Sequence, residues 1–115
     1  MLDSEWRVLF YRSAQGNFPV RDFLDNLEID LRVHVVGRIK LLARMGVELR
    51  SPHAKHVEKE IWELRYGAVR IFYAAVSGRR LILLHAIMKK RNRIPRHDIV
   101  LAHKRLNDFR NRDTH

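Results

Sequence analysis

Cationic side chains gather where three predicted strands meet their turns. Arg65 closes one strand, Arg70 lies near the start of the next, and a third strand runs into the basic segment Lys89–Arg93. Several cations at one end of a sheet would form a phosphate site, because guanidinium and ammonium groups bind phosphoryl oxygens. Such a site best supports attack of an RNA 2′-hydroxyl on the adjacent phosphate, which needs a base, an acid and fixed positive charge.

Histidines are the candidate acids and bases, because histidine exchanges protons near neutral pH. His53 and His56 lie beside Lys55 in a predicted loop and are the best placed, whereas His85 lies within a strand and is expected to be a hydrogen-bonded structural residue. The other histidines are assigned to helix surfaces or to the tail: His34, His97, His103 and His115. No metal site is predicted, because the chain has no cysteine and no HExxH motif.

The two arginines also have a purely structural interpretation. An arginine in the middle of a strand beside aromatic residues is costly to bury unpaired. Glu63 lies two residues before Arg65 and on the strand next to that of Arg70, so a structural Glu63–Arg65 or cross-strand Glu63–Arg70 pair would satisfy the arginines. Both interpretations stay open from the sequence alone.

The elements that must position these residues form an antiparallel meander. Ile61–Arg65, Val69–Val76 and Leu81–Ile87 are rich in β-branched and aromatic residues, and Gly-containing breaks at Tyr66-Gly67 and Ser77-Gly78 separate them. Side chains alternate between faces along a strand. Ile71, Tyr73 and Ala75 should therefore face one side of the second strand, and Arg70, Phe72 and Ala74 the other.

Upstream of the meander, Glu5–Arg12 is predicted to be a strand and Ser13–Pro19 a turn. A helix follows from Pro19, with apolar residues at helical spacing. Asp30–Arg44 alternates like a strand at its start, but its longer pattern has helical spacing and ends at Gly46, so we predict a helix. The two helices would form a hairpin on one sheet face.

The remaining segments are a loop, a last helix and a tail. Val47–Glu60 is predicted to be a loop with Ser51-Pro52 as its clearest signal, and it carries His53, Lys55 and His56. Pro95 opens a final helix, and Asn111–His115 is expected to be frayed.

Size and composition indicate one folded domain over residues 1–115, with 46% hydrophobic residues. No apolar run is long enough to cross a bilayer, and Asp3 and Glu5 occupy the place of a signal peptide's basic region, so we expect a cytoplasmic protein without a membrane partner.

Lys and Arg number 23 against 13 Asp and Glu, a formal net charge of +10. Nucleic acid is the leading partner; an acidic protein or simple solubility is the alternative.

At these residues the sequence resembles the RelE/ParE superfamily of type II toxin–antitoxin toxins, and within it the HigB-like, phage-related branch. The resemblance runs from about Val8 to Asp108. Its matching features, in chain order, are Gly16, Val20, Phe23-Leu24, Gly46, Trp62-Glu63-Leu64-Arg65, Arg70-Ile71-Phe72-Tyr73, Leu83-Leu84-His85-Ala86, Lys89-Lys90, Pro95, Ile99, Ala102 and Arg105. The sequence departs from the family pattern at Ile87, where an aromatic residue is usual, and at Asp98, where Glu is commoner.

The resemblance implies an α+β fold: a small, curved, mainly antiparallel sheet packed against an N-terminal helical hairpin, with a C-terminal helix. It implies a ribosome-dependent mRNA endonuclease without metal or other cofactor, neutralised by an antitoxin, commonly a helix-turn-helix protein.

Carried onto this chain, the resemblance gives catalytic roles to Arg65 and Arg70, which would stabilise phosphoryl charge, to Lys90, and to His56 as general base. It assigns contacts with RNA to a further set of basic residues: His53, Lys55, Lys89, Arg91 and Arg93. Two of these assignments have an alternative: Lys89 in place of Lys90, and His53 in place of His56 as the general base.

Two other functions remain alternatives. One is a non-catalytic binder, either a ParE-like inhibitor of DNA gyrase or a toxin relic that only binds its antitoxin. The other is a small nucleic-acid-binding module, which rests on charge alone. The cluster of Arg65, Arg70, Lys89 and Lys90 favours the endonuclease, because gyrase inhibition needs no phosphate site.

Overall fold

The structure is a computed structural model that describes residues 5–113. Helices and strands follow one another in this order: β1 (Arg7–Phe10), α1 (Pro19–Asp25), α2 (Ile29–Met45), the short 3₁₀ helix η1 (Gly46–Glu48), β2 (Ala54–Glu58), β3 (Ile61–Tyr66), β4 (Val69–Val76), β5 (Arg80–Met88) and α3 (Arg96–Asp113).

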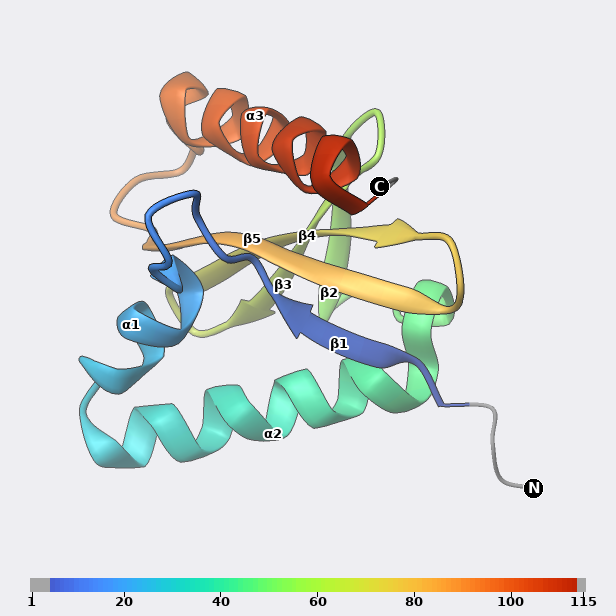
Figure 1. Cartoon of the computed structure of the whole chain (residues 1–115). Coiled ribbons are helices and arrows are strands. Elements are labelled where there is room, and N and C mark those ends of the chain that lie inside the picture. The colour runs from blue at the N-terminus through green and yellow to red at the C-terminus, as the bar shows by residue number, and fades with distance from the viewer. Residues whose placement is uncertain (1–4, 114–115) are drawn as a thin grey trace.

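The strands form one mixed sheet in the order β1-β5-β4-β3-β2 (Figure 1). Consecutive strands from β2 to β5 pair antiparallel, and β1 pairs parallel with β5 at the edge. The predicted meander over β3, β4 and β5 is confirmed, and so is the mainly antiparallel α+β fold.

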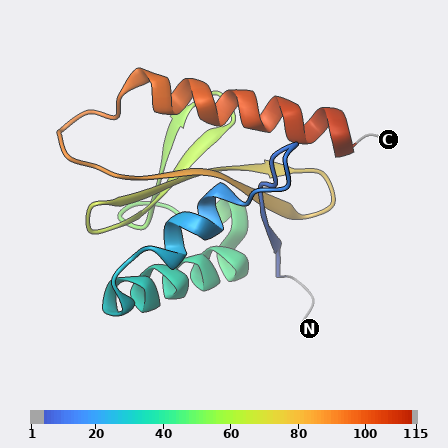
Figure 2. The same ribbon diagram turned by 60° about the vertical axis from the view of Figure 1, so that its left-hand side comes forward.

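The helices cover both faces of the sheet (Figure 2). On one face α1 and α2 enclose a core that includes Leu42 of α2 and Tyr73 of β4. On the other face α3 packs over Phe72 of β4 and supplies Ala102 and Leu106 to a second core. The alternation predicted for β4 is therefore confirmed, because an apolar side chain is needed on each of its two covered faces.

Local sequence signals explain both helices of the hairpin. Pro19 occupies the first turn of α1, where its missing N–H leaves no bond unmade. Gly46 ends α2 with a φ of +57°. A Cβ at Gly46 would lie 2.1 Å from Nε1 of Trp6, so glycine is required both for the backbone conformation and for this close approach. This contact fixes the end of α2 beside the start of β1.

Two expectations are wrong. The predicted loop Val47–Glu60 contains the end of η1 and the whole strand β2. Lysine, histidine and glutamate are weak strand formers, so β2 depends on its pairing with β3, which no local pattern reports. The predicted frayed tail is helical as far as Asp113, whose carboxylate forms an ion pair with Arg80 at 2.8 Å. The rest of that tail, residues 114–115, lies outside the described residues.

Across residues 5–113, the helices are all too short or too polar to cross a membrane.

Candidate functional site

Pairing of the central strands places the predicted cations on the sheet face that α3 covers. Arg65 of β3 is directly opposite Arg70 of β4, and Arg70 is opposite Ile87 of β5. The next row along the strands holds Glu63, Phe72 and His85. Residues directly opposite one another in a sheet share a face, so Arg65 and Arg70 are neighbours, as the sequence predicted.

Glu63 lies between the two arginines. Its Oε2 is 3.3 Å from Nε of Arg65 and 3.7 Å from Nε of Arg70. The structural pairing considered from the sequence is therefore present with both partners. One carboxylate balances two guanidinium groups, which leaves a net positive charge in this cluster of three side chains.

The two arginines differ in burial. The Arg65 side chain is 28% exposed, whereas those of Arg70 and Glu63 are 8% exposed. Arg70 donates through Nη1 to the carbonyls of Gly67 and Val69 at 2.7 and 2.9 Å, so it is held against the β3–β4 turn. Burial lowers the pKa of Arg70, and the positive charge of Arg65 adds to this effect. Arg65 is thus the more accessible cation, and Arg70 lies behind it.

A hollow of about 340 Å³ opens beside this pair and is lined by Arg38, His53, Arg65 and Arg70. His53 directly precedes β2, and its carbonyl accepts a hydrogen bond from the Arg65 amide at 2.8 Å. The buried atoms Nδ1 of His53 and Nε of Arg70 have no hydrogen-bond partner in the described chain. Both atoms are shielded from solvent, so the accessible donor that a ligand in this hollow would meet is the guanidinium group of Arg65.

Arg38 is a further cation of this hollow that the sequence did not indicate. It lies on α2, donates to the backbone carbonyl of Arg65, and its guanidinium is 5.2 Å from the ring centre of Tyr66. No motif could have identified it, because its position depends on how α2 crosses the end of β3. It adds a third guanidinium group to the hollow.

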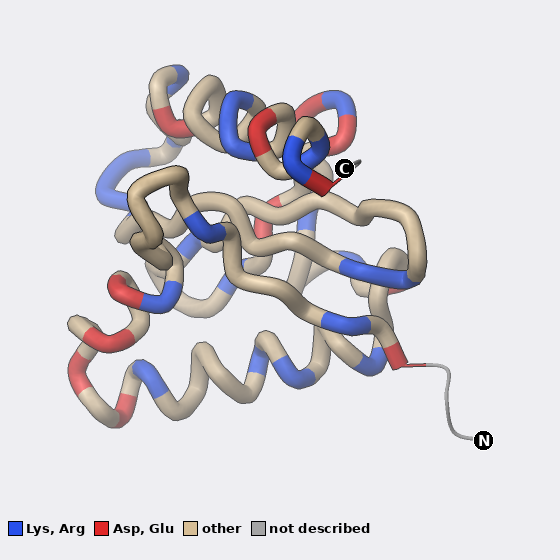
Figure 3. The backbone as a smooth tube through the Cα atoms, viewed as in Figure 1, with Lys and Arg blue, Asp and Glu red and all other residues tan. Residues whose placement is uncertain are grey.

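The basic segment Lys89–Arg93 lies at the same end of the sheet. The amide of Lys89 donates to the carbonyl of Ala68 in the β3–β4 turn at 2.7 Å. A second hollow, of about 380 Å³, is lined by Ile87 and by Lys89, Lys90, Arg91 and Arg93. Because Ile87 is paired with Arg70, the two hollows adjoin. Figure 3 shows this segment as a blue stretch between β5 and α3.

Lys55 and His56 occupy opposite faces of β2. Lys55 is paired with Glu63 and shares the face of the arginines, where it is exposed. His56 is paired with Trp62, and the two rings contact each other at 5.3 Å between centroids on the face of α2. Nε2 of His56 donates to the carbonyl of Lys59 at 2.7 Å. The structure therefore brings His53, but not His56, to the arginine pair.

His85 has the hydrogen-bonded role that the sequence predicted. Its Nε2 lies 2.7 Å from Oδ1 of Asp98 on α3, and its ring stacks on Phe72. Burial lowers the pKa of His85, although the hydrogen bond to Asp98 acts in the opposite direction. This pair ties α3 to the sheet beside the row of arginines.

The sheet, its helical hairpin and its C-terminal helix define a RelE-like α+β fold. The chain is similar in fold to a chain of the toxin–antitoxin complex RelBE2 from Mycobacterium tuberculosis, with a TM-score of 0.54 and 18% identity over 74% of this chain and 99% of that chain. The family model described as "Phage derived protein Gp49-like (DUF891)" matches residues 22–107, and the chain belongs to this family.

No curated protein matches the chain in sequence. The resemblance found in the sequence is confirmed in two respects: the chain belongs to a phage-derived family, and its fold is RelE-like.

Proposed function

We propose that this protein is the toxin of a toxin–antitoxin system and that it cleaves mRNA on the ribosome. The observation that carries the proposal is the hollow in which Arg38, Arg65 and Arg70 converge with His53, beside a second basic hollow. Membership of the phage-derived Gp49-like family supports it, as does a fold neighbour that comes from a toxin–antitoxin complex.

In the proposed reaction the 2′-hydroxyl oxygen of one ribonucleotide attacks the adjacent phosphorus. The bond from phosphorus to the 5′-oxygen of the next nucleotide breaks, leaving a cyclic phosphate and a 5′-hydroxyl. Arg65, supported by Arg70 and Arg38, would stabilise the charge that develops on the phosphoryl oxygens. His53 lines the same hollow and would take the proton of the 2′-hydroxyl.

Exposed and half-buried cations would hold the RNA backbone outside this centre. Lys89, Lys90, Arg91 and Arg93 line the adjoining hollow, and Lys55 projects from the same sheet face. Lys90 is exposed, so a part in proton transfer requires RNA to bring the leaving oxygen to it. A metal is not part of the proposed reaction, since the fixed cations supply the positive charge.

The proposed partners are mRNA bound to the ribosome in the cytoplasm and a neutralising antitoxin, of the helix-turn-helix type. Their shared chemistry is negative charge, which the formal net charge of +10 attracts over a distance.

The contacts of Glu63 favour a second candidate function. If its ion pairs with Arg65 and Arg70 only stabilise the sheet, the protein is a non-catalytic binder, either of DNA gyrase or of an antitoxin alone. The two functions differ in their cellular effects: cleavage removes messages, whereas inhibition of gyrase leaves them intact and damages DNA.

Induction of the protein without an antitoxin, followed by mapping of transcript ends, separates these functions. We expect cuts within translated codons. The cuts should be lost in Arg65→Ala and kept in Lys40→Ala. Lys40 is an exposed cation on α2, away from the sheet face of the arginines, and so is the matched control. Growth arrest with intact messages and a DNA-damage response would replace the proposal by gyrase inhibition.

A further inference from the structure

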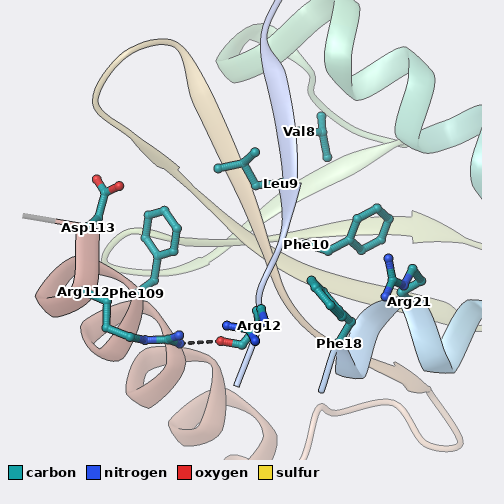
Figure 4. Close-up of a pocket in the computed structure, with 9 residues that line it drawn as sticks. All are labelled: Val8, Leu9, Phe10, Arg12, Phe18, Arg21, Phe109, Arg112 and Asp113. Carbon is teal, nitrogen blue, oxygen red and sulfur yellow. Dashed lines mark hydrogen bonds between the residues drawn. The ribbon is translucent and has the colours of Figure 1, made fainter. Parts of the chain in front are cut away.

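A groove of about 580 Å³ runs along the free edge of the sheet, on strand β1 (Figure 4). The end of α3 forms one wall, and α1 with the residue before it forms the other. Aromatic and cationic side chains line it from both sides: Phe10, Phe18 and Phe109, with Arg12, Arg21 and Arg112. None of the residues placed in the RNA site belongs to this groove.

Strand β1 has one bonded edge and one free edge. The amides of Arg7 and Tyr11 donate to the carbonyls of Arg79 and Leu83, at 2.9 and 3.0 Å, on the side of β5. Bonding groups alternate along a strand in a parallel pair, so the amides and carbonyls of Val8 and Phe10 point away from β5. Between Glu5 and Asp113, no element pairs with this edge. An unpaired edge is a template for another strand.

The groove walls match the two faces of such an added strand. Phe10 and Phe18 lie on the side of α1, whereas Leu9 and Phe109 lie on the side of α3 (Figure 4). Side chains of a strand point alternately to opposite faces. An added segment would therefore place successive apolar side chains against the two aromatic walls in turn.

The charge of the groove indicates the sign of its occupant. Asp113, its one carboxylate, is bonded to Arg80 at 3.0 and 2.8 Å. Arg112 is bonded to Asp108 and to the carbonyl of Arg12. The guanidinium groups of Arg12 and Arg21 have no carboxylate partner in the part of the chain that the structure describes, and that of Arg21 lies 3.9 Å from the ring centre of Phe18.

We propose that this groove binds an extended acidic segment of a partner protein, which pairs with β1 as a further strand of the sheet. Its backbone would bond Val8 and Phe10, its apolar side chains would contact the two aromatic walls, and its carboxylates would reach Arg12 and Arg21. A second copy of this chain is disfavoured, because pairing two β1 edges would bring like charges together. The inference goes beyond the nuclease site and stands without it.

The test uses the full chain and a yeast-displayed library of random ten-residue peptides. Selected peptides are expected to carry several Asp or Glu residues among alternating apolar residues. Their affinity should fall at least ten-fold in Arg12→Glu/Arg21→Glu and stay unchanged in Lys40→Glu/Arg44→Glu, which makes the same charge change on α2. An equal fall in both double variants would overturn the proposal, because it would show attraction by net charge alone.

Val8→Pro tests the strand pairing directly. Proline removes the outward amide of Val8 without removing a bond to β5, so the fold should remain and the peptides should bind at least ten-fold more weakly. Hydrogen exchange on the unaltered protein gives a second measure: a bound peptide should protect the amides of Val8 and Phe10. Peptide binding without such protection would overturn the proposal.

Two further results would assign the groove to another occupant and overturn the proposal. The first is a dimer of the unaltered chain that Val8→Pro dissociates. The second is a single-stranded RNA that displaces the peptides from the unaltered chain but binds Arg12→Glu/Arg21→Glu more weakly. Failure of RNA cleavage in any of these variants is not part of the test, so the nuclease proposal can fail independently.

Discussion

Two basic regions at one end of the sheet differ in how firmly their side chains are held. Arg65 and Arg70 lie in the sheet, share Glu63 and are 28% and 8% exposed. The segment Lys89–Arg93 follows β5 as an irregular connection, and its side chains form no ion pair among the described residues. Arg65 and Arg70 form a rigid region that is partly shielded from water. Lys89–Arg93 form a solvated segment.

This difference predicts a division of labour. Positive charge fixed in a water-poor site stabilises a transition state, because no reorganisation is needed when charge develops. Solvated cations contribute affinity instead, through release of counterions from nucleic acid. Arg65 and Arg70 should therefore control the rate of cleavage, and Lys89–Arg93 should control RNA binding and its dependence on salt.

The largest effect is expected for Arg65→Ala. Loss of the accessible guanidinium should lower the cleavage rate of ribosome-bound mRNA by about 10²–10³-fold, the usual cost of one fixed electrostatic group. Primer extension in a purified translation system measures this rate. Lys40→Ala, which removes an exposed cation on α2, should retain full activity. An undiminished rate in Arg65→Ala would end the distinction between the two regions.

Glu63→Gln should distinguish the two basic regions by their contributions to the free energy of unfolding. Without the carboxylate, Arg65 and Arg70 remain adjacent like charges, so the free energy of unfolding should fall by about 1–3 kcal/mol. Lys90→Ala in the solvated segment should change it by less than about 0.5 kcal/mol. Urea unfolding of both variants gives the comparison. Equal, small effects would show that Glu63 does not hold the arginine pair.

The solvated segment should respond to salt. Lys90→Ala/Arg91→Ala/Arg93→Ala should weaken binding of single-stranded RNA and lower the slope of log K against log salt by about 2, since each lost phosphate contact contributes about 0.7. Fluorescence anisotropy from low to moderate salt measures the slope. Arg65→Ala, with one contact removed, should lower it by less than about 1. A greater change in Arg65→Ala would reverse the assigned roles.

The same contrast explains what the sequence could predict. Alternation and Gly-containing turns identify β3, β4 and β5, and alternation alone places Arg70 and Phe72 on one face. Counting residues outward from the short β3–β4 turn places Arg65 opposite Arg70 and Glu63 in the adjacent row on the same face, within reach of both arginines. Local patterns thus specify the rigid region well.

Features that depend on distant contacts were not predictable. Strand β2 has a polar composition and exists because β3 pairs with it, so His53 and His56 could not be assigned to faces beforehand. Arg38 reaches the hollow only through the crossing of α2 over β3. The catalytic assignments themselves remain proposals, since no local signal distinguishes a structural ion pair from a phosphate site.

The smallest effect concerns His85, on the face of the rigid region. Its pKa is lowered by burial, whereas in the unfolded chain it should be near 6.5. As pH falls below about 6.5, the unfolded state binds a proton that the folded state does not, so the free energy of unfolding should decrease, by at most about 1.4 kcal/mol per pH unit. Above about 6.5 this contribution is complete.

The window from about pH 5 to 6.5 isolates this histidine, because the carboxylates with lowered pKa lose their contribution at lower pH. Among these, hydrogen bonds from Arg96 and then His103 lower the pKa of Glu58 to about 2. His85→Asn should flatten the dependence in this window, while His34→Asn, at an exposed position of α2, should retain it. Urea unfolding at closely spaced pH values measures the slope. An unchanged slope in His85→Asn would mean that the rigid region is open to water at this position, and the contrast with the solvated segment would then be confined to the arginine pair.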